Sequence, residues 1–273
     1  MNTFRKFAVT LILMSCSLAI IGAALLIAYF GIDYYLGTKT YSDLQHYIEF
    51  DAVSSVENGL LSEQQAQVPI VDFEALAQIN PDVVGWIFIP DTRVNYPIVK
   101  RANDNDYYLS HIFDGSQNKT GSIFLDTRNS FGDSHVLIHG HNMGNGAMFR
   151  DLELFKNRQF FQDHPYFFLF TPDQNFIVEL FAGSIVRIDS PVWQLDFSGP
   201  TDIQEWLLHC RMAASVSRNL TVTPDNHVIT LSTCTYEYKQ ARWILQGVIS
   251  PMDEADSELI ETLLSQFSVS TDS

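Results

Sequence analysis

The chain has 273 residues, of which 46% are hydrophobic and 13% aromatic, and its formal net charge is −16. This apolar content excludes a disordered acidic chain, which lacks the buried surface that offsets ordering entropy. The acidic balance argues against binding to nucleic-acid phosphates. Three cysteines without a C-x-x-C pair exclude a disulfide scaffold and argue against structural zinc.

The N-terminal part of the chain contains an uncharged run from Phe7 to Ile32. A helix through this run is longer than the roughly 30 Å hydrocarbon core of a bilayer. Arg5 and Lys6 precede the run, so the positive-inside rule predicts a cytoplasmic N-terminus and an extracytoplasmic remainder. A cleavable signal peptide is the alternative interpretation, although its apolar stretch is normally only about 7–15 residues long.

The charge is distributed unevenly around this run. The first 40 residues carry a net charge of +2, so the rest of the chain carries −18. This pattern indicates an acidic domain outside a cell membrane, repelled by anionic lipid and polymer. We expect a single-pass membrane protein with a cytoplasmic tip (1–6), a transmembrane signal anchor (7–32), a helical linker region (33–72), a folded domain (73–252) and a C-terminal tail (253–273).

Helical spacing is clearest, outside the membrane run, between residues 41 and 80. Apolar residues recur with a helical period over Tyr41–Ser55 and again over Phe73–Ile79, where Asn80 and Pro81 end the pattern. The segment Ser54–Val68 is rich in Gln, Ser and Glu and predicts a flexible connection.

From Val83 onward the sequence consists mostly of short β-branched and aromatic runs separated by turn residues. The predicted strands are 83–89, 94–99, 121–125, 135–140, 166–170, 175–188, 227–233 and 242–249. A break of the long run at Ala182 and Gly183 would give nine strands instead of eight. This spacing predicts an all-β barrel or sandwich.

The exception is Asp202–Val216, where apolar residues follow a helical period and Thr201 or Asp202 is a candidate N-cap. Cys210 lies on the apolar face of this helix and is expected to be an inert core thiol. The predicted fold is therefore mainly β, a single barrel with N-terminal helices and a helix inserted between two late strands.

Two places in the sequence could carry chemistry. Cys234 ends a β-branched strand, and Arg242 opens the next strand, which favours a reactive thiolate; a small hydrophobe closing the barrel is the equally weighted alternative. His135, His139 and His141 could align on one face as metal ligands, or His141 could pair with Cys234 for acyl transfer at the barrel rim.

These residues together resemble the sortases, the membrane-anchored cysteine transpeptidases of Gram-positive bacteria. The resemblance rests on Thr-Leu-Ser-Thr-Cys (230–234), the downstream Arg242 and Gly-His-Asn-Met (140–143). Class B sortases are resembled in particular by the stretches at 79–90, 94–115 and 121–129 and by the position of the helix at 202–216. The resemblance covers about Phe73 to Ile249 and implies an eight-stranded sortase β-barrel.

The resemblance also implies roles for individual residues. Cys234 matches the nucleophile, His141 the catalytic histidine that follows a glycine, and Arg242 the arginine that stabilises the oxyanion. Four further residues are expected to line the peptide groove: Asn105, Leu109, Ser232 and Thr233.

The implied activity is cysteine transpeptidation without a metal or organic cofactor. Secreted proteins with a C-terminal sorting motif would be cleaved through a thioester and joined to an amine of lipid II or peptidoglycan, or to a pilin lysine. A membrane-tethered binding module without chemistry and a metalloprotein built on the histidines are the alternatives. The sorting motif and the acceptor do not follow from the sequence.

Overall fold

The structure is a computed structural model that describes residues 2–49 and 69–253. Eight strands form a closed barrel in the order β11-β10-β6-β5-β4-β3-β7-β8, which closes where β8 pairs with β11. The barrel strands are β3 (Val83–Phe88), β4 (Asn95–Val99), β5 (Ile123–Leu125), β6 (His135–His139), β7 (Tyr166–Phe170), β8 (Asn175–Arg187), β10 (His227–Cys234) and β11 (Ala241–Pro251). The expected eight-stranded barrel is therefore confirmed.

Most neighbouring barrel strands are antiparallel, but β4–β5 and β6–β10 are parallel pairs. The parallel register sets His139 of β6 opposite Ser232 of β10. Because β6 and β10 run side by side in the same direction, the residues that follow them emerge at the same rim of the barrel.

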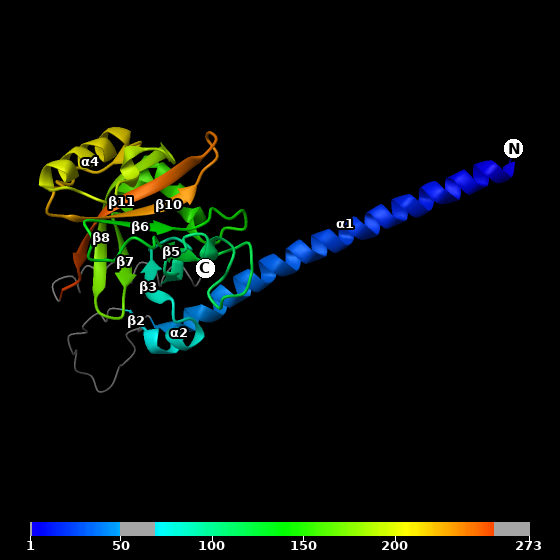
Figure 1. Ribbon diagram of the computed structural model, residues 1–273, viewed down its shortest axis with the longest axis horizontal. Helices are drawn as coiled ribbons and strands as arrows, with labels where there is room; N and C mark the ends of the chain where they lie inside the picture. Colours follow the sequence, from blue (N-terminus) through cyan, green and yellow to red (C-terminus); the bar gives the residue numbers. More distant parts are fainter. Residues whose placement is uncertain (1, 50–68, 254–273) are drawn as a thin grey trace, which may run out of the picture.

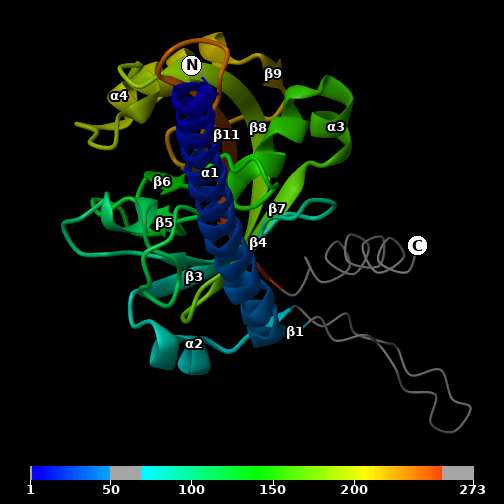
Figure 2. The same cartoon turned by 90° about the vertical axis from the view of Figure 1, so that its right-hand side faces the viewer.

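Helices and short strands surround the barrel. The helices are α1 (Asn2–Leu44), α2 (Phe73–Ile79), α3 (Arg158–Asp163) and α4 (Pro200–Ala213), with 3₁₀ segments η1 (Gln45–Tyr47), η2 (Tyr107–Leu109), η3 (Phe149–Lys156) and η4 (Pro191–Trp193). The two-residue strands β1 (Ile48–Glu49) and β2 (Ile70–Val71) pair with each other, and β9 (Val216–Ser217) pairs with the outer part of β8. Both views place α2 and α4 on opposite sides of the barrel (Figures 1 and 2).

The barrel interior is filled by large aromatic side chains such as Trp86, Phe88 and Phe168, none of them more than 1% exposed. A second cluster lies between α4 and the barrel wall and contains Trp206 and Cys210. Burial raises the pKa of the Cys210 thiol to about 12, so this cysteine is the inert core thiol that the sequence predicts.

Helix α1 projects from the barrel as one continuous rod, and in Figure 2 it points toward the viewer (Figures 1 and 2). Large apolar side chains along it are exposed, among them Leu18 at 69% and Ile27 at 73%. The helix is long and apolar enough to cross a membrane. Its C-terminal end differs, because Tyr41 and Leu44 are buried in the barrel core.

Several expected boundaries differ from the structure. The helix predicted over Tyr41–Ser55 is the end of α1 and η1, followed by β1. The part from residue 50 lies outside the described residues, as does the whole predicted connection at 54–68. β1 forms there because it has a pairing partner, β2, that helical spacing does not reveal.

Strand β8 runs unbroken through Ala182 and Gly183, so the barrel has eight strands and not the alternative nine. The pairing of β8 with β11 shifts register between Gln246 and Gly247, so β8 contains a bulge and remains one strand. Helix α4 has Gly199 as its N-cap, with Pro200 as the first helical residue, and it ends at Ala213 because the chain then enters β9. The helices η3 and α3 were not predicted.

Candidate active site

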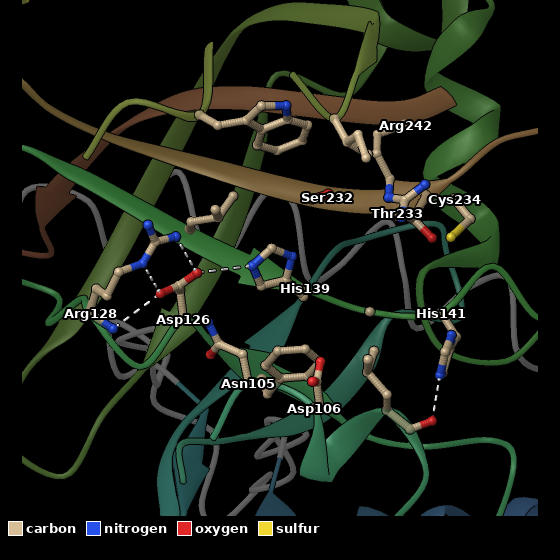
Figure 3. A pocket seen from close by; sticks show the side chains of 16 residues that line it. Asn105, Asp106, Asp126, Arg128, His139, His141, Ser232, Thr233, Cys234 and Arg242 are labelled. Atoms are coloured by element: carbon tan, nitrogen blue, oxygen red, sulfur yellow. Dashed lines mark hydrogen bonds and ion pairs between the residues drawn. The ribbon is translucent and has the colours of Figure 1, made fainter. Parts of the chain in front are cut away.

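A pocket of about 500 Å³ opens at the barrel rim where β6 and β10 end (Figure 3). Its lining contains all seven residues that the sequence predicted for the site: Asn105, Leu109, His141, Ser232, Thr233, Cys234 and Arg242. These residues come from three separate stretches of the chain. The closed barrel brings the three stretches to one rim.

Cys234 is the last residue of β10 and lies directly opposite Arg242 in the antiparallel β10–β11 register. Side chains of directly opposite residues project from the same face of a sheet, with Cβ atoms about 4.5–5.5 Å apart. Figure 3 shows the Arg242 guanidinium on the same side of the pocket as the Cys234 thiol. Its one hydrogen bond to a described residue goes to the Ala241 carbonyl at 3.1 Å, so its other N–H groups have no partner among the described residues.

His141 follows the end of β6 by two residues. Its Nε2 lies 2.7 Å from the carbonyl oxygen of Leu109. Because a carbonyl can only accept, Nε2 must carry the proton, and Nδ1 is free to exchange a proton in the pocket. In Figure 3 the bonded nitrogen of His141 points away from Cys234.

The glycine before His141 has a packing role. A Cβ on Gly140 would lie 2.6 Å from the buried ring of Phe149, so the chain can turn out of β6 here only with a glycine. The Gly140 N–H also donates to the Ser232 carbonyl at 3.1 Å, which holds the turn against β10. The Gly-His pair therefore places the histidine beside the end of the cysteine strand.

A polar network connects the segment after His141 with the end of β10. The side-chain amide of Asn142 donates to the Cys234 carbonyl and to Glu153, each at 2.8 Å. Lys156 donates to the Thr235 hydroxyl at 2.7 Å and to Glu237 at 2.6 Å. These contacts connect η3 with the barrel rim at the end of β10.

Two groups at the end of β10, the Glu237 carboxylate and the Thr235 N–H, already have hydrogen-bond partners. Although burial raises the pKa of Glu237, hydrogen bonds from Lys156 and Thr235 lower it to about 2, so this carboxylate is committed to the network. The Thr235 N–H donates to the Ala241 carbonyl at 3.3 Å, so it already has a partner. Arg242 is thus the donor best placed for an oxyanion.

The pocket wall farthest from Cys234 is polar, and sequence reasoning missed it. The buried carboxylate of Asp126 accepts hydrogen bonds from Arg128 at 2.8 and 2.9 Å, and His139 lies 3.4 Å from it. Burial alone would raise the pKa of Asp126, but these hydrogen bonds hold it well below its usual range. Asp126 and Arg128 lie in the stretch Gly-Ser-Ile-Phe-Leu-Asp-Thr-Arg, one of those that resemble class B sortases.

Replacing Asp126 by Asn should therefore remove a part of the stability that depends on pH. A depressed pKa adds stability above the unfolded-state value and loses it as the pH falls toward the folded-state value. We expect wild type to be more stable than Asp126→Asn by about 1–3 kcal/mol at pH 7. Urea unfolding should give the same difference at pH 5 and a smaller one at pH 3, below the usual Asp pKa of about 3.9.

The matched control is Asp106→Asn, an exposed carboxylate on the same pocket wall. Its free energy of unfolding should stay within about 0.5 kcal/mol of wild type. An Asp126→Asn difference that is the same at pH 7 and pH 3 would contradict the ionised, hydrogen-bonded state of Asp126.

The groove residues differ in their contacts. The Asn105 side chain accepts from the Thr127 N–H at 2.8 Å, and Leu109 is 42% exposed at the pocket mouth. Ser232 and Thr233 are buried at the pocket base, and the Thr233 hydroxyl has no hydrogen-bond partner among the described residues.

The remaining histidine of the sequence motif has a structural role. His135 is fully buried between the Gln194 carbonyl, 2.7 Å from Nδ1, and the Thr230 hydroxyl, 2.8 Å from Nε2. Burial lowers its pKa to about 4, so the ring is neutral at pH 7. The three histidines do not converge, and no group of three or more His, Cys, Asp or Glu suited to a metal occurs in the part of the chain that the structure describes.

Known proteins share this sequence and fold. A family model described as Sortase domain matches residues 87–250. Sortase B of Listeria monocytogenes is 37% identical over 176 residues, which cover 63% of this chain and 71% of that protein. Sortase B of Staphylococcus aureus is 27% identical over 205 residues, which cover 74% of this chain and 83% of that protein.

The solved structures agree with the sequence relatives. Sortase B from B. anthracis is 30% identical with a TM-score of 0.68, and the match covers 81% of this chain and 99% of that one. A Staphylococcus aureus sortase B–substrate complex is 27% identical with a TM-score of 0.63, and the match covers 66% of this chain and 85% of that one.

Because the family model spans more than half of the chain, the chain belongs to the sortase family. The relatives above place it with the class B sortases, and its activity is that of a sortase transpeptidase, an enzyme that uses a cysteine. Nothing in these comparisons favours a binding module without chemistry.

Proposed function

We propose that Cys234 is the nucleophile, His141 the general acid and base, and Arg242 the oxyanion donor of this transpeptidase. The observation that carries the proposal is the β10–β11 register, which sets Cys234 opposite Arg242 in a pocket that His141 also lines. A thiol, an imidazole with one free nitrogen and a guanidinium are the groups that acyl transfer requires.

In the first half of the reaction, the Cys234 thiolate attacks the backbone carbonyl carbon of a threonine in the sorting motif. The carbonyl oxygen becomes an oxyanion, which the Arg242 guanidinium stabilises; one such donor is typically worth roughly 3–4 kcal/mol. The threonine C–N bond then breaks, and protonated His141 gives its Nδ1 proton to the leaving amine. The product is a thioester on Cys234.

In the second half, an acceptor amine attacks the thioester. Neutral His141 Nδ1 takes a proton from the attacking nitrogen, and the C–S bond breaks to restore the Cys234 thiolate. The thioester is reactive toward amines, so transfer competes with hydrolysis. The Leu109 carbonyl keeps the imidazole in the same orientation in both halves, because its bond to Nε2 persists whether Nδ1 is protonated or not.

The peptide groove follows from the shape of the pocket. It runs from Cys234 and His141 toward Asn105 and the Asp126 wall (Figure 3). We assign Asn105, Leu109, Ser232 and Thr233 to binding of the sorting motif. That a sortase B has been solved as a substrate complex supports a substrate-binding site in this fold.

We further propose that residues 7–32 of α1 anchor the enzyme in the cell membrane of a Gram-positive bacterium. Arg5 and Lys6 would lie in the cytoplasm, with a linker region at 33–72, the barrel at 73–252 and a tail at 253–273 outside. The exposed apolar surface of α1 and its length support this placement. The acceptor is then an amine found outside the cell, in lipid II or peptidoglycan or on a pilin lysine.

Mass spectrometry of covalently wall-linked proteins, in the source strain and in a strain lacking this gene, tests the proposed function. At least one secreted protein with a C-terminal sorting segment should disappear from the wall fraction. The mass of its linked C-terminal fragment identifies the acceptor amine. An unchanged set of wall-linked proteins and pilin polymers would contradict cell-surface transpeptidation by this enzyme.

A further inference from the structure

The C-terminal end of α1 lies against the segment that supports His141. This segment, residues 107–122, begins with η2 and is called the support loop here. Residues 30, 33, 37 and 41 of α1 contact it, and their spacing of three to four places them on one helix face. The contacts are Lys119 over the Phe30 ring at 3.9 Å, Asn118 donating to the Asp33 carbonyl at 2.7 Å, Gly37 packed against Thr120, and Tyr41 donating to the Gly121 carbonyl at 2.7 Å.

Tyr41 makes the innermost of these contacts. Its side chain is 4% exposed, and its ring packs edge-on against Tyr96 with 5.3 Å between ring centroids. Its hydroxyl also lies 2.9 Å from the Ser122 hydroxyl. Because Tyr41 gives its one proton to the Gly121 carbonyl, Ser122 is the donor of this second bond, and it can donate instead to the His111 carbonyl, also 2.9 Å away. One tyrosine from α1 therefore holds the end of the support loop at two points.

The opposite side of the same loop contacts His141. The Leu109 carbonyl accepts from His141 Nε2. Gly121 has a φ of +61°, and a Cβ there would lie 2.9 Å from His141 Cδ2 and 2.7 Å from the Tyr108 carbonyl oxygen. Gly121 is thus clamped between the Tyr41 hydroxyl on one side and the imidazole on the other.

We propose that Tyr41 is a positioning residue for His141, so that the outer end of the membrane helix is part of the catalytic support. This inference rests on the proposed role of His141. Backbone hydrogen bonds join the two ends of the support loop, among them the one from the Ser122 N–H to the Tyr108 carbonyl at 2.9 Å. Loss of the Tyr41 bond to Gly121 at one end can therefore displace the Leu109 carbonyl at the other.

The position of the β10–β11 turn relative to α1 can be followed in Figure 1. The turn between β10 and β11, drawn in orange, lies on the side of the barrel from which α1 projects. The contact face on α1 begins at Phe30, within the proposed membrane span. The helix that holds the enzyme in the bilayer and the loop that orients its general acid and base are therefore joined without a flexible connection.

The test compares the full-length enzyme and its Tyr41→Phe variant in detergent, using a sorting peptide identified from the wall-linked proteins. Removing the hydroxyl keeps the ring and its packing. We expect kcat to fall about 5–10-fold with KM changed less than about twofold, because a loosened catalytic group affects the chemical steps and leaves peptide binding intact. The Nε2 proton resonance of His141, protected in wild type by the Leu109 carbonyl, should broaden in the variant.

Two further variants separate positioning from general destabilisation. Ser122→Ala removes the second partner of the Tyr41 hydroxyl and should lower kcat in the same direction, by a smaller factor. Tyr47→Phe changes a partly buried tyrosine of the neighbouring η1 segment, which makes no hydrogen bond to the support loop in residues 2–49 and 69–253, and should keep wild-type kcat.

The outcomes are distinct from those of the proposed function. If wild type forms no thioester with the peptide, the proposed function fails. If wild type is active and Tyr41→Phe keeps its kcat and its Nε2 resonance, the positioning role of Tyr41 is overturned. An equal loss of kcat in Tyr47→Phe would also overturn it, because the effect would then be general.

Discussion

Cys234→Ala should abolish formation of the covalent peptide–enzyme intermediate. Incubation of the full-length enzyme with a sorting peptide is expected to add the mass of the acyl fragment to wild type and nothing to the variant. Transpeptidation should fall by several orders of magnitude, since loss of a nucleophile from a comparable triad costs on the order of 10⁶-fold in kcat. Intact-protein mass spectrometry measures the adduct directly.

Cys210→Ala is the matched control for this experiment. It is the same substitution at the buried thiol of α4, 0% exposed and outside the pocket. The variant should be less stable, because the buried side chain is lost, yet it should form the adduct in full. An adduct that persists in Cys234→Ala would show that another residue is the nucleophile.

Arg242→Lys should lower kcat about 10²–10³-fold while KM changes little, which corresponds to the loss of one oxyanion donor. A lysine retains the charge, but its compact ammonium cannot reproduce the planar guanidinium fork. Both halves of the reaction pass through an oxyanion, so single-turnover acylation and thioester aminolysis should slow together. Rapid-quench kinetics with the sorting peptide and an acceptor amine measure the two steps separately.

Arg187→Lys is the appropriate comparison. Arg187 lies on β8, opposite Ala241 of β11, and pairs at the exposed surface with Asp189. Its replacement should leave both steps near wild-type rates, because exposed ion pairs contribute little. Turnover of Arg242→Lys within about threefold of wild type would remove the oxyanion role from Arg242, given the size expected for one donor.

The strand pattern could be predicted from sequence because it depends on local chemistry. β-branched and aromatic runs with turn residues between them indicate β3 to β8, β10 and β11 with boundaries within a few residues. The elements that were missed or misplaced depend on partners far away in the chain. β1 exists because β2 lies beside it, and β8 continues through Gly183 with a bulge at Phe181 that depends on its pairing with β11.

The same division applies to the site. Cys234, His141 and Arg242 could be picked out because a short motif carries them, and the structure places all three in one pocket. Their roles remain predictions for the experiments above. The Asp126 wall could not be found by the same reasoning, because it requires knowing that Asp126 is buried and that Arg128 folds back onto it.

Sequence alone was enough to predict an apolar helix long enough for a membrane and an acidic barrel domain. It also distinguished Cys234, at the end of a strand, from the other two cysteines. These properties are additive or local, so composition, run length and short spacing are enough to define them. The contacts that hold α1 and the rim residues in place follow only from the tertiary structure. Only the closed barrel brings the rim residues together, and only the docking of α1 sets Tyr41 against Gly121, a contact between residues 80 positions apart that no local pattern encodes.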